Sequence, residues 1–319
     1  MNDDALDELR ACLPRELDSP TTVITRIAAG LSGAGVYRVD AGDKAFVLKI
    51  STPDDPFESW RSRLDIQQHA ALARIAPAIV HVDEGRRAVV SEFVADRSFP
   101  ALLMTPQTRA TAIELLARTL RAVHELPIPA NAPRSDARAF LSTIWSAVDG
   151  SHPLPPFVSE IIGRALATER PEVAGPEVVS HNDVNPSNLV YDGERVMLLD
   201  WDVCGVHEPF YDLATISVFM RMDDESCRQL LEAYDGATLT TIPARFSYDR
   251  RLVASLCGTM FLYLAARSGR PVMTGAERLE EMPTLAEFYQ RMRAGELSPA
   301  TPDGQRQFAM AMLRESARI

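Results

Sequence analysis

The pattern of apolar residues changes about a third of the way along this chain, and that change limits the folds it can adopt. Three early segments are rich in β-branched or alternating apolar residues and predict strands: 22–28, 36–40 and 45–50. In the third segment Phe46, Leu48 and Ile50 share one face. From residue 105 onward apolar residues recur every three or four positions, which is typical of helices. The sequence therefore predicts an α+β protein with a small antiparallel sheet in its N-terminal part and a larger, mainly helical C-terminal part.

Further elements follow from the same patterns. A helix is expected over 58–75, ending before Pro77, and a second helix is expected from Thr105 to Val123, with Thr105 as its cap. The remaining expected elements are a hairpin of 79–82 and 88–94, a helix near 161–168, a hairpin of 188–191 and 195–199, and mainly helix over 223–319. We expect two lobes, residues 1–95 and 96–319, joined by a hinge at about 91–98.

Composition narrows the class of protein and of partner. With 319 residues, 46% hydrophobic and 24% charged, the chain has the balance of a globular protein. Its net charge of −11 disfavours nucleic acid and anionic membranes as partners, because these polyanions would be repelled. The four cysteines form no C-x-x-C pair, the first residues are acidic rather than basic, and no apolar stretch is long enough to cross a bilayer. We expect a cytoplasmic protein without membrane or nucleic-acid partners.

The segment that carries most chemistry begins at His181 and reads H-N-D-V-N-P-S-N, followed by the second hairpin and then L-D-W-D. Asp183, Asn188 and Asp200 stand at the edges of this hairpin. Phosphoryl transfer needs a carboxylate to deprotonate the attacking hydroxyl and oxygen ligands to hold Mg²⁺ on the nucleotide phosphates. Asp and Asn also cap turns in proteins without any catalytic role, and that structural interpretation stays open for each residue alone. The three together predict a phosphotransfer site.

Lys49 lies on the same face of the third strand as Val47 and interrupts an otherwise apolar pattern. A lysine in such a place needs an anionic partner, and the phosphates of ATP would provide one. The alternative is an edge strand on which Lys49 points to water.

These motifs resemble the kinase-like phosphotransferases, a family that includes aminoglycoside phosphotransferases, choline and ethanolamine kinases and bacterial thiamine kinases. The resemblance implies a two-lobed, protein-kinase-like fold that uses ATP and Mg²⁺. It implies that Asp183 is the catalytic base and that Asn188 and Asp200 bind Mg²⁺. It further implies that Lys49 binds the phosphates and that Val47 packs on adenine.

Two further segments receive nucleotide-binding roles from the resemblance. The glycine-rich stretch 30–35 stands where the family carries a loop over the phosphates, with Ser32 and Gly33 as contacts, although an ordinary hairpin turn has the same composition. Ser91 to Val94 resembles the hinge, where the Glu92 carbonyl and the Val94 amide would bond adenine. An ordinary strand end would look the same.

The chain also departs from the family. A glutamate on the first helix usually pairs with the strand lysine, and here Gln68 takes its place, which leaves Asp65, Glu58 or no residue as the partner of Lys49. Farther on, the segment from Glu208 to Ala214 resembles the family's D-P-x-Y-D-L-A, in which Asp212 would brace the catalytic loop.

We expect the acceptor to be a small-molecule hydroxyl, because the chain lacks the H-R-D, D-F-G and A-P-E segments of protein kinases. The motifs favour an alcohol of the choline, ethanolamine or thiamine type, with an aminoglycoside or other antibiotic as the alternative. Aromatic residues would suit an onium group, and carboxylates would suit an aminoglycoside. The aromatic candidates are Trp145, Trp201, Tyr263 and Tyr289, and the acidic ones are Asp202, Glu208 and Asp223. A catalytically silent nucleotide-binding module is the alternative of another class.

Overall fold

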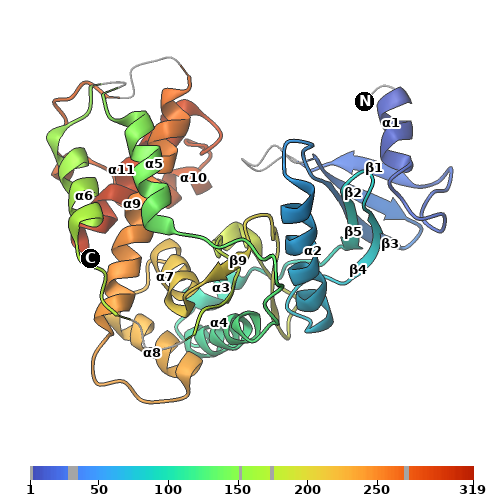
Figure 1. Cartoon of the computed structure of the whole chain (residues 1–319), viewed down its shortest axis with the longest axis horizontal. Helices are drawn as coiled ribbons and strands as arrows, with labels where there is room; N and C mark the ends of the chain where they lie inside the picture. Colours follow the sequence, from blue (N-terminus) through green and yellow to red (C-terminus); the bar gives the residue numbers. More distant parts are fainter. Residues whose placement is uncertain (1–2, 28–34, 151–152, 173–175, 269–272) are drawn as a thin grey trace. The chain divides into compact units, whose positions relative to one another are not determined.

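The computed structural model describes residues 3–27, 35–150, 153–172, 176–268 and 273–319. The chain forms two compact units (Figure 1). The first unit consists of Met1–Pro133 and Ser187–Val206, and the second consists of Arg134–Pro186 and His207–Ile319. Asn188, Asp200 and the hairpin between them therefore belong to the first unit, whereas Asp183 belongs to the second. The predicted lobes of residues 1–95 and 96–319 stay a prediction.

A five-stranded antiparallel sheet forms the centre of the first unit, with the strand order β1-β2-β3-β5-β4. Its strands are β1 (Val23–Arg26), β2 (Gly35–Ala41), β3 (Lys44–Ile50), β4 (Ile79–Asp83) and β5 (Ala88–Glu92). The early strand predictions are confirmed, because β-branched residues and apolar residues at alternate positions suit a pleated, half-buried surface.

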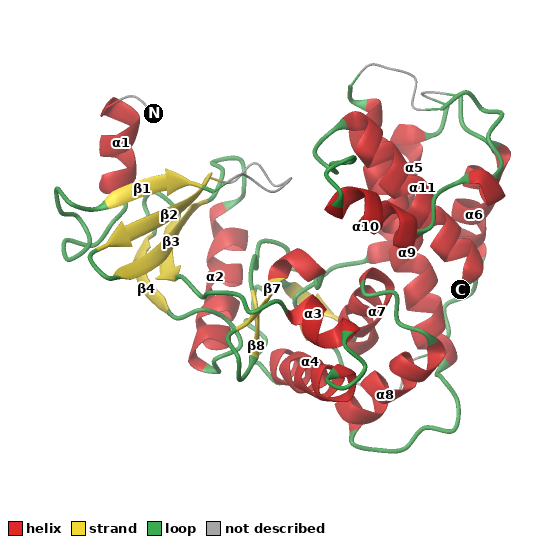
Figure 2. Cartoon of the chain, turned by 180° about the vertical axis from the view of Figure 1, so that it is seen from behind, coloured by secondary structure: helices red, strands yellow, loops and turns green. Residues whose placement is uncertain are grey.

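Helices cover the two faces of this sheet (Figure 2). On one face α1 (Asp3–Arg10) and the residues after it pack Leu9 and Leu13 against Leu48. On the other face α2 (Phe57–Leu72) packs Trp60 and Leu64 against Val89. Because side chains alternate along a strand, Lys49 and Val47 share the α2 side of β3, opposite Leu48.

The rest of the first unit is helical and supports a small hairpin. It contains α3 (Phe99–Met104), α4 (Arg109–His124), β7 (Leu189–Tyr191) and β8 (Val196–Leu198). The 3₁₀ helix η1 (Pro186–Asn188) and β9 (Gly205–His207) lie at its boundaries, with Pro186 and His207 in the second unit. The Thr119 hydroxyl of α4 donates to the Val196 carbonyl of β8 at 3.1 Å. Thr105 does not cap the long helix as expected. It ends α3 instead, where its backbone N–H and its hydroxyl both donate to the Ala101 carbonyl.

In the second unit a long central helix, α9 (Ala244–Ala266), organises the packing (Figure 1). The helices packed against it are α5 (Ala137–Val148), α6 (Pro156–Ala167), α7 (Pro209–Phe219) and α11 (Pro302–Arg318). The remaining elements are β6 (Val178–Ser180), α8 (Asp224–Asp235), η2 (Leu279–Glu281) and α10 (Leu285–Arg293). None of the helices in the described part of the chain is long and apolar enough to cross a bilayer.

The expected α+β class is confirmed, and the mainly helical character after residue 223 is confirmed with it. The sequence analysis did not predict α5. The residue that could have indicated the start of this helix is Asp136. Its carboxylate caps α5 by accepting from the backbone N–H groups of Arg138 and Ala139. The glycine-rich stretch, including Ser32 and Gly33, lies mostly outside the described residues.

Candidate active site

The β7–β8 hairpin brings two of the predicted site residues to the same end of a small ladder. Leu189 pairs with Leu198 across the hairpin, and the Leu199 backbone N–H donates to the Asn188 carbonyl at 2.8 Å. Gly193 makes the turn possible with a φ of 111°, a conformation that a Cβ would disfavour. Asn188 directly precedes β7, and Asp200 lies two residues after the end of β8.

The segment after β8 is anchored by its tryptophan. The Trp201 indole is 3% exposed, and its N–H donates to the Leu198 carbonyl at 3.1 Å. Asp200 adopts a left-handed backbone conformation with a φ of 62°, which is uncommon outside glycine and is found at functional sites. Trp201 is therefore a core residue and not a face for a substrate, while the aspartates on both sides of it stay partly exposed.

Both of these aspartates bind Lys49. The Lys49 Nζ lies 2.5 Å from Asp200 Oδ1 and 2.7 Å from Asp202 Oδ1. Burial acts to lower the pKa of Lys49, but the negative charges of Asp202 and Asp200 outweigh it and raise the pKa above its usual value. Lys49 is therefore a cation held on the α2 side of β3, and the edge-lysine alternative is not what the structure shows.

Asp65, one of the expected substitutes for the helix glutamate, has a different partner. Its carboxylate pairs with Arg61 one turn earlier on α2, at 3.3 Å. Glu58 lies exposed in the first turn of the same helix. Asp202 was not among the expected partners of Lys49, although an acidic residue two positions after Asp200 is visible in the sequence.

The segment expected to be the hinge, Ser91 to Val94, is held by backbone hydrogen bonds on both of its sides. The Phe93 N–H donates to the Ala45 carbonyl of β3, and the Glu92 N–H donates to the Ala78 carbonyl on the other side. Because the N–H and the carbonyl of one strand residue point to the same side, the Glu92 carbonyl points away from β3, as its N–H does. Val47 pairs with Ser91 in the neighbouring strand and lies half-buried on the Lys49 face.

A groove of about 560 Å³ lies beside this hinge, and Phe46, Phe93 and Leu17 are among the residues that line it. Phe46 alternates with Val47 along β3 and points to the face of the sheet opposite Lys49. The groove therefore belongs to the face covered by the N-terminal segment and not to the Lys49 side.

In the second unit, the loop that carries Asp183 is fixed by hydrogen bonds to a buried aspartate. The backbone N–H groups of His181 and Asn182 donate to Asp212 at 2.7 and 2.9 Å, and Asp212 is fully buried in α7. Asn182 adopts a left-handed conformation with a φ of 64°. The Asn185 side-chain amide donates to Asp183 Oδ1 at 3.0 Å and so orients the carboxylate. Asn185 is a second residue that the sequence analysis missed.

The surroundings of Asp183 come from α7 and α9. Burial, and then the negative charge of Asp183, raise the pKa of the Cys257 thiol on α9 to about 12. Burial also raises the pKa of Tyr211 in α7, and the Cys257, Asp212 and Asp183 charges add to the increase. A neutral thiol and a neutral phenol therefore lie near the Asp183 carboxylate.

Two of the three carboxylates considered for an aminoglycoside, Glu208 and Asp223, are engaged in structural interactions. Glu208 binds Arg170 at 2.8 Å and also pairs with Arg245, which in turn binds the buried Asp249 at 3.0 Å. Asp223 caps α8 by accepting from the Ser226 N–H at 2.9 Å. These two carboxylates are occupied by the fold itself.

The aromatic candidates of the second unit are Trp145, Tyr263 and Tyr289, and all three are half-buried. Among the described residues, none forms a hydrogen bond with the buried Tyr289 hydroxyl. Burial, followed by the charge of Cys257, raises the pKa of Tyr289.

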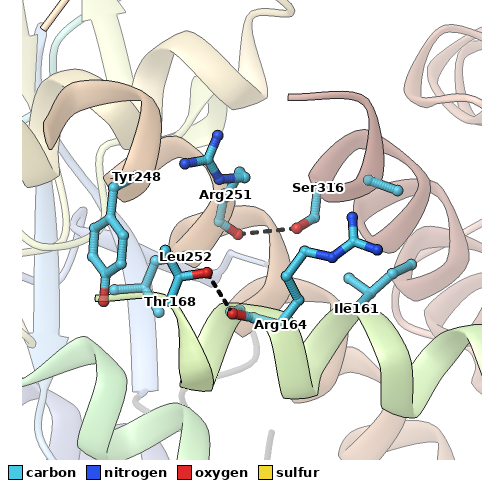
Figure 3. A pocket seen from close by; sticks show the side chains of 9 residues that line it. Ile161, Arg164, Thr168, Tyr248, Arg251, Leu252 and Ser316 are labelled. Carbon is cyan, nitrogen blue, oxygen red and sulfur yellow. Dashed lines mark hydrogen bonds between the residues drawn. The ribbon is translucent and has the colours of Figure 1, made fainter. Parts of the chain in front are cut away.

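A separate cavity in the second unit lies between α6, α9 and α11 (Figure 3). Arg164, Tyr248 and Arg251 are among its lining residues, and the hydroxyls of Thr168 and Ser316 donate to the carbonyls of Arg164 and Arg251. Its volume is about 20 Å³, room for about one water molecule. It cannot hold an acceptor substrate.

The donor set at the hairpin fits magnesium. Asn188 offers an amide oxygen and Asp200 a carboxylate, and Mg²⁺ prefers such hard oxygen ligands, usually one or two from the protein with the rest from water and phosphates. Asn188 is buried and fixed at the start of β7, so its side chain is held in place.

An antiparallel sheet with a lysine on its third strand, followed by the H-x-D-x-x-x-x-N loop, the hairpin and an aspartate, defines a kinase-like phosphotransferase. The sequence profile of the phosphotransferase enzyme family matches residues 23–251, and the chain belongs to this family.

Individual relatives agree with this family in fold. The choline/ethanolamine kinase family protein from Mesorhizobium loti superposes with a TM-score of 0.64 at 21% identity, covering 97% of this chain and 99% of that one. The macrolide 2'-phosphotransferase MphH from Brachybacterium faecium gives a TM-score of 0.57 at 19% identity, covering 84% and 94%. Protein LicA of Haemophilus influenzae is 34% identical over 58 residues, which are 18% of this chain and only 22% of LicA. The expected family and its two-lobed fold are confirmed.

Proposed function

We propose that this protein transfers the γ-phosphate of ATP to a hydroxyl group of a small molecule. Phosphotransfer is the general activity of its family. The observation that supports the proposal best is the contact of Lys49 with Asp200, two motif residues that are 151 positions apart in the chain. The contact supports phosphate binding by Lys49 and metal binding by Asp200, because phosphoryl transfer needs such a cation and such a carboxylate close together.

Asp183 acts as the general base in this mechanism. It accepts the proton of the acceptor hydroxyl while the oxygen attacks the γ-phosphorus. Asn185 keeps the carboxylate in one orientation through Oδ1, and Asp212 holds the loop backbone that carries Asp183. The base is therefore positioned before the substrate arrives, which lowers the entropic cost of the reaction.

The nucleotide is bound by the first unit. Lys49 binds the phosphates, and Asn188 and Asp200 hold Mg²⁺, which neutralises charge on the phosphate oxygens. Val47 packs on adenine, while the Glu92 carbonyl and the Val94 N–H form hydrogen bonds with its edge. Ser32 and Gly33 complete the phosphate contacts in this proposal.

We assign the acceptor to the alcohols of the choline, ethanolamine or thiamine type. Glu208 and Asp223 are engaged in ion pairing and helix capping, which removes support for a carboxylate-lined aminoglycoside site. The fold likeness to a choline/ethanolamine kinase family protein and the short match to LicA are consistent with this acceptor class. The four cysteines are all free, which suits a reducing cytoplasm.

A panel of acceptors tests the proposal. Purified protein is incubated with ATP and Mg²⁺ and with choline, ethanolamine, thiamine, a macrolide or an aminoglycoside, and phosphorylated product is measured by mass spectrometry. We expect product with an amino alcohol or thiamine, and a loss of about 10²- to 10⁴-fold in kcat for Asp183→Asn with nucleotide affinity retained. Product only with an antibiotic would overturn the acceptor assignment. Nucleotide binding without transfer to any acceptor would instead favour the silent module.

A further inference from the structure

We propose that Asp202 is the residue that positions the Lys49 ammonium for the ATP phosphates, in place of an acidic residue on α2. The inference rests on the proposed function, because it assigns a supporting residue to the phosphate-binding role of Lys49. Asp202 is thus a positioning residue that acts through Lys49.

The contact geometry carries the proposal. Lys49 Nζ lies between two carboxylates, 2.5 Å from Asp200 Oδ1 and 2.7 Å from Asp202 Oδ1. The lysine side chain is 22% exposed, while those of Asp200 and Asp202 are 37% and 36% exposed. An ammonium carries three N–H donors on a flexible stem, so two short contacts of this kind fix its position.

The two aspartates differ in what else they must do. Asp200 is the carboxylate at the end of the hairpin beside Asn188, so its oxygens are needed for Mg²⁺. A carboxylate that turns toward a divalent cation is a weaker partner for an ammonium. Asp202 follows Trp201 in the chain and has no metal to hold in this proposal, so it can keep its contact with Lys49 when the nucleotide and its metal are bound.

The acidic residues of α2 do not provide this support. Asp65 is partly exposed and paired with Arg61 of its own helix. The expected glutamate position on α2 is Gln68, which carries no charge. The carboxylate that pairs with Lys49 therefore lies in the segment after β8 and not on α2. The same segment carries the proposed metal ligand Asp200.

A double-mutant cycle tests whether Asp202 acts through Lys49. Asp202→Asn is prepared in the natural chain and in a Lys49→Met background, and kcat/KM for ATP is measured in all four proteins. We expect Asp202→Asn to lower kcat/KM by about tenfold in the natural chain and by less than twofold without Lys49, because contacting residues that act together are not additive. Equal losses in both backgrounds, or no loss in the first, would overturn the proposal.

Two measurements in the same proteins do not depend on transfer activity. The affinity for ADP without metal, from calorimetry, should change with Asp202→Asn only when Lys49 is present. The affinity for Mn²⁺ with ADP should fall in Asp200→Asn and stay within twofold in Asp202→Asn. A loss of Mn²⁺ affinity in Asp202→Asn would make Asp202 a metal ligand and overturn the proposal. If the natural protein transfers no phosphate, the proposed function fails while the ADP cycle still decides the role of Asp202.

Matched variants separate positioning from folding. Asp202→Glu keeps the charge and should recover most of the lost kcat/KM. Asp40→Asn removes a similarly exposed carboxylate that pairs with Arg38 on β2, and we expect it to change kcat/KM by less than twofold. Asp65→Asn tests the helix directly, and a tenfold loss in that variant would return the role to α2. Thermal unfolding of each variant identifies any loss that comes from misfolding.

Discussion

The side-chain amide of Asn185 donates a hydrogen bond to Asp183 Oδ1 at 3.0 Å, and the Asn185 backbone N–H donates to the Asp183 carbonyl at 2.9 Å. The first bond orients the carboxylate, and the second holds the backbone of the loop that carries it. Removing the amide by Asn185→Ala leaves the carboxylate without this orienting donor. We expect kcat to fall about tenfold, as for a hydrogen bond to a charged group worth roughly 1.5 kcal/mol, while KM for ATP stays within twofold.

Steady-state kinetics with the best acceptor of the panel measure this effect. The exposed Asn131 offers a control, and Asn131→Ala should leave kcat unchanged. A rise in KM for ATP with an unchanged kcat would show that Asn185 serves the nucleotide and not the base.

Asp212 should contribute far more to stability than an exposed aspartate that makes the same kind of bonds. Its buried carboxylate accepts from the N–H groups of His181 and Asn182, which lose a charged acceptor in Asp212→Asn. We expect a decrease of about 2–3 kcal/mol in the free energy of unfolding. Asp136 also accepts from two backbone N–H groups but is exposed at the start of α5, so Asp136→Asn should cost less than about 1 kcal/mol. Urea titrations of both variants compare the two costs, and equal costs would contradict this argument.

The buried His207 predicts a pH dependence of stability. Burial lowers its pKa below the usual value of 6.5, and its Nδ1 accepts from the Glu208 N–H at 2.8 Å, which needs the neutral ring. The unfolded chain takes up the proton more readily, so this stabilisation is present above pH 6.5 and is lost as the pH falls through the folded-state pKa. We expect the difference in unfolding free energy between the natural chain and His207→Gln to shrink as the pH falls from 8 to 5. A difference that grows toward low pH would show that the folded protein prefers the charged ring.

Two helical glycines should respond to alanine in opposite directions. A Cβ on Gly258 of α9 would lie 2.8 Å from the Leu313 side chain of α11, whereas a Cβ on Gly163 of α6 would meet no atom within 4 Å. Alanine favours helix over glycine by restricting the unfolded chain, so Gly163→Ala should stabilise by about 0.4–1 kcal/mol. Gly258→Ala should destabilise by about 1–3 kcal/mol, because overpacking outweighs that gain. Thermal unfolding measures both, and stabilisation by Gly258→Ala would show that α9 and α11 can separate without cost.

Local patterns in the sequence predicted those parts of the fold that depend on neighbours along the chain. The alternation that puts Lys49 and Val47 on one face of β3 depends on residues only two positions apart. The turn of the second hairpin likewise depends on a few neighbouring residues. Both elements form as expected. Periodicity was less reliable at the ends of elements. The first helix was expected over 58–75, but α2 ends at Leu72, which is 83% exposed and lies beyond the sheet-packing residues Trp60 and Leu64.

The sequence by itself determined the family, the strand lysine and the order of polar residues around the hairpin, because each is a short pattern set by local geometry. Only the tertiary structure decided which groups those residues contact. Lys49 binds Asp202 rather than an acidic residue on α2. The backbone N–H of His181 donates to the carboxylate of Asp212, 31 residues later in the chain. Such contacts join segments that are distant in the chain. They depend on the packing of whole helices and strands, which no local spacing of residues specifies.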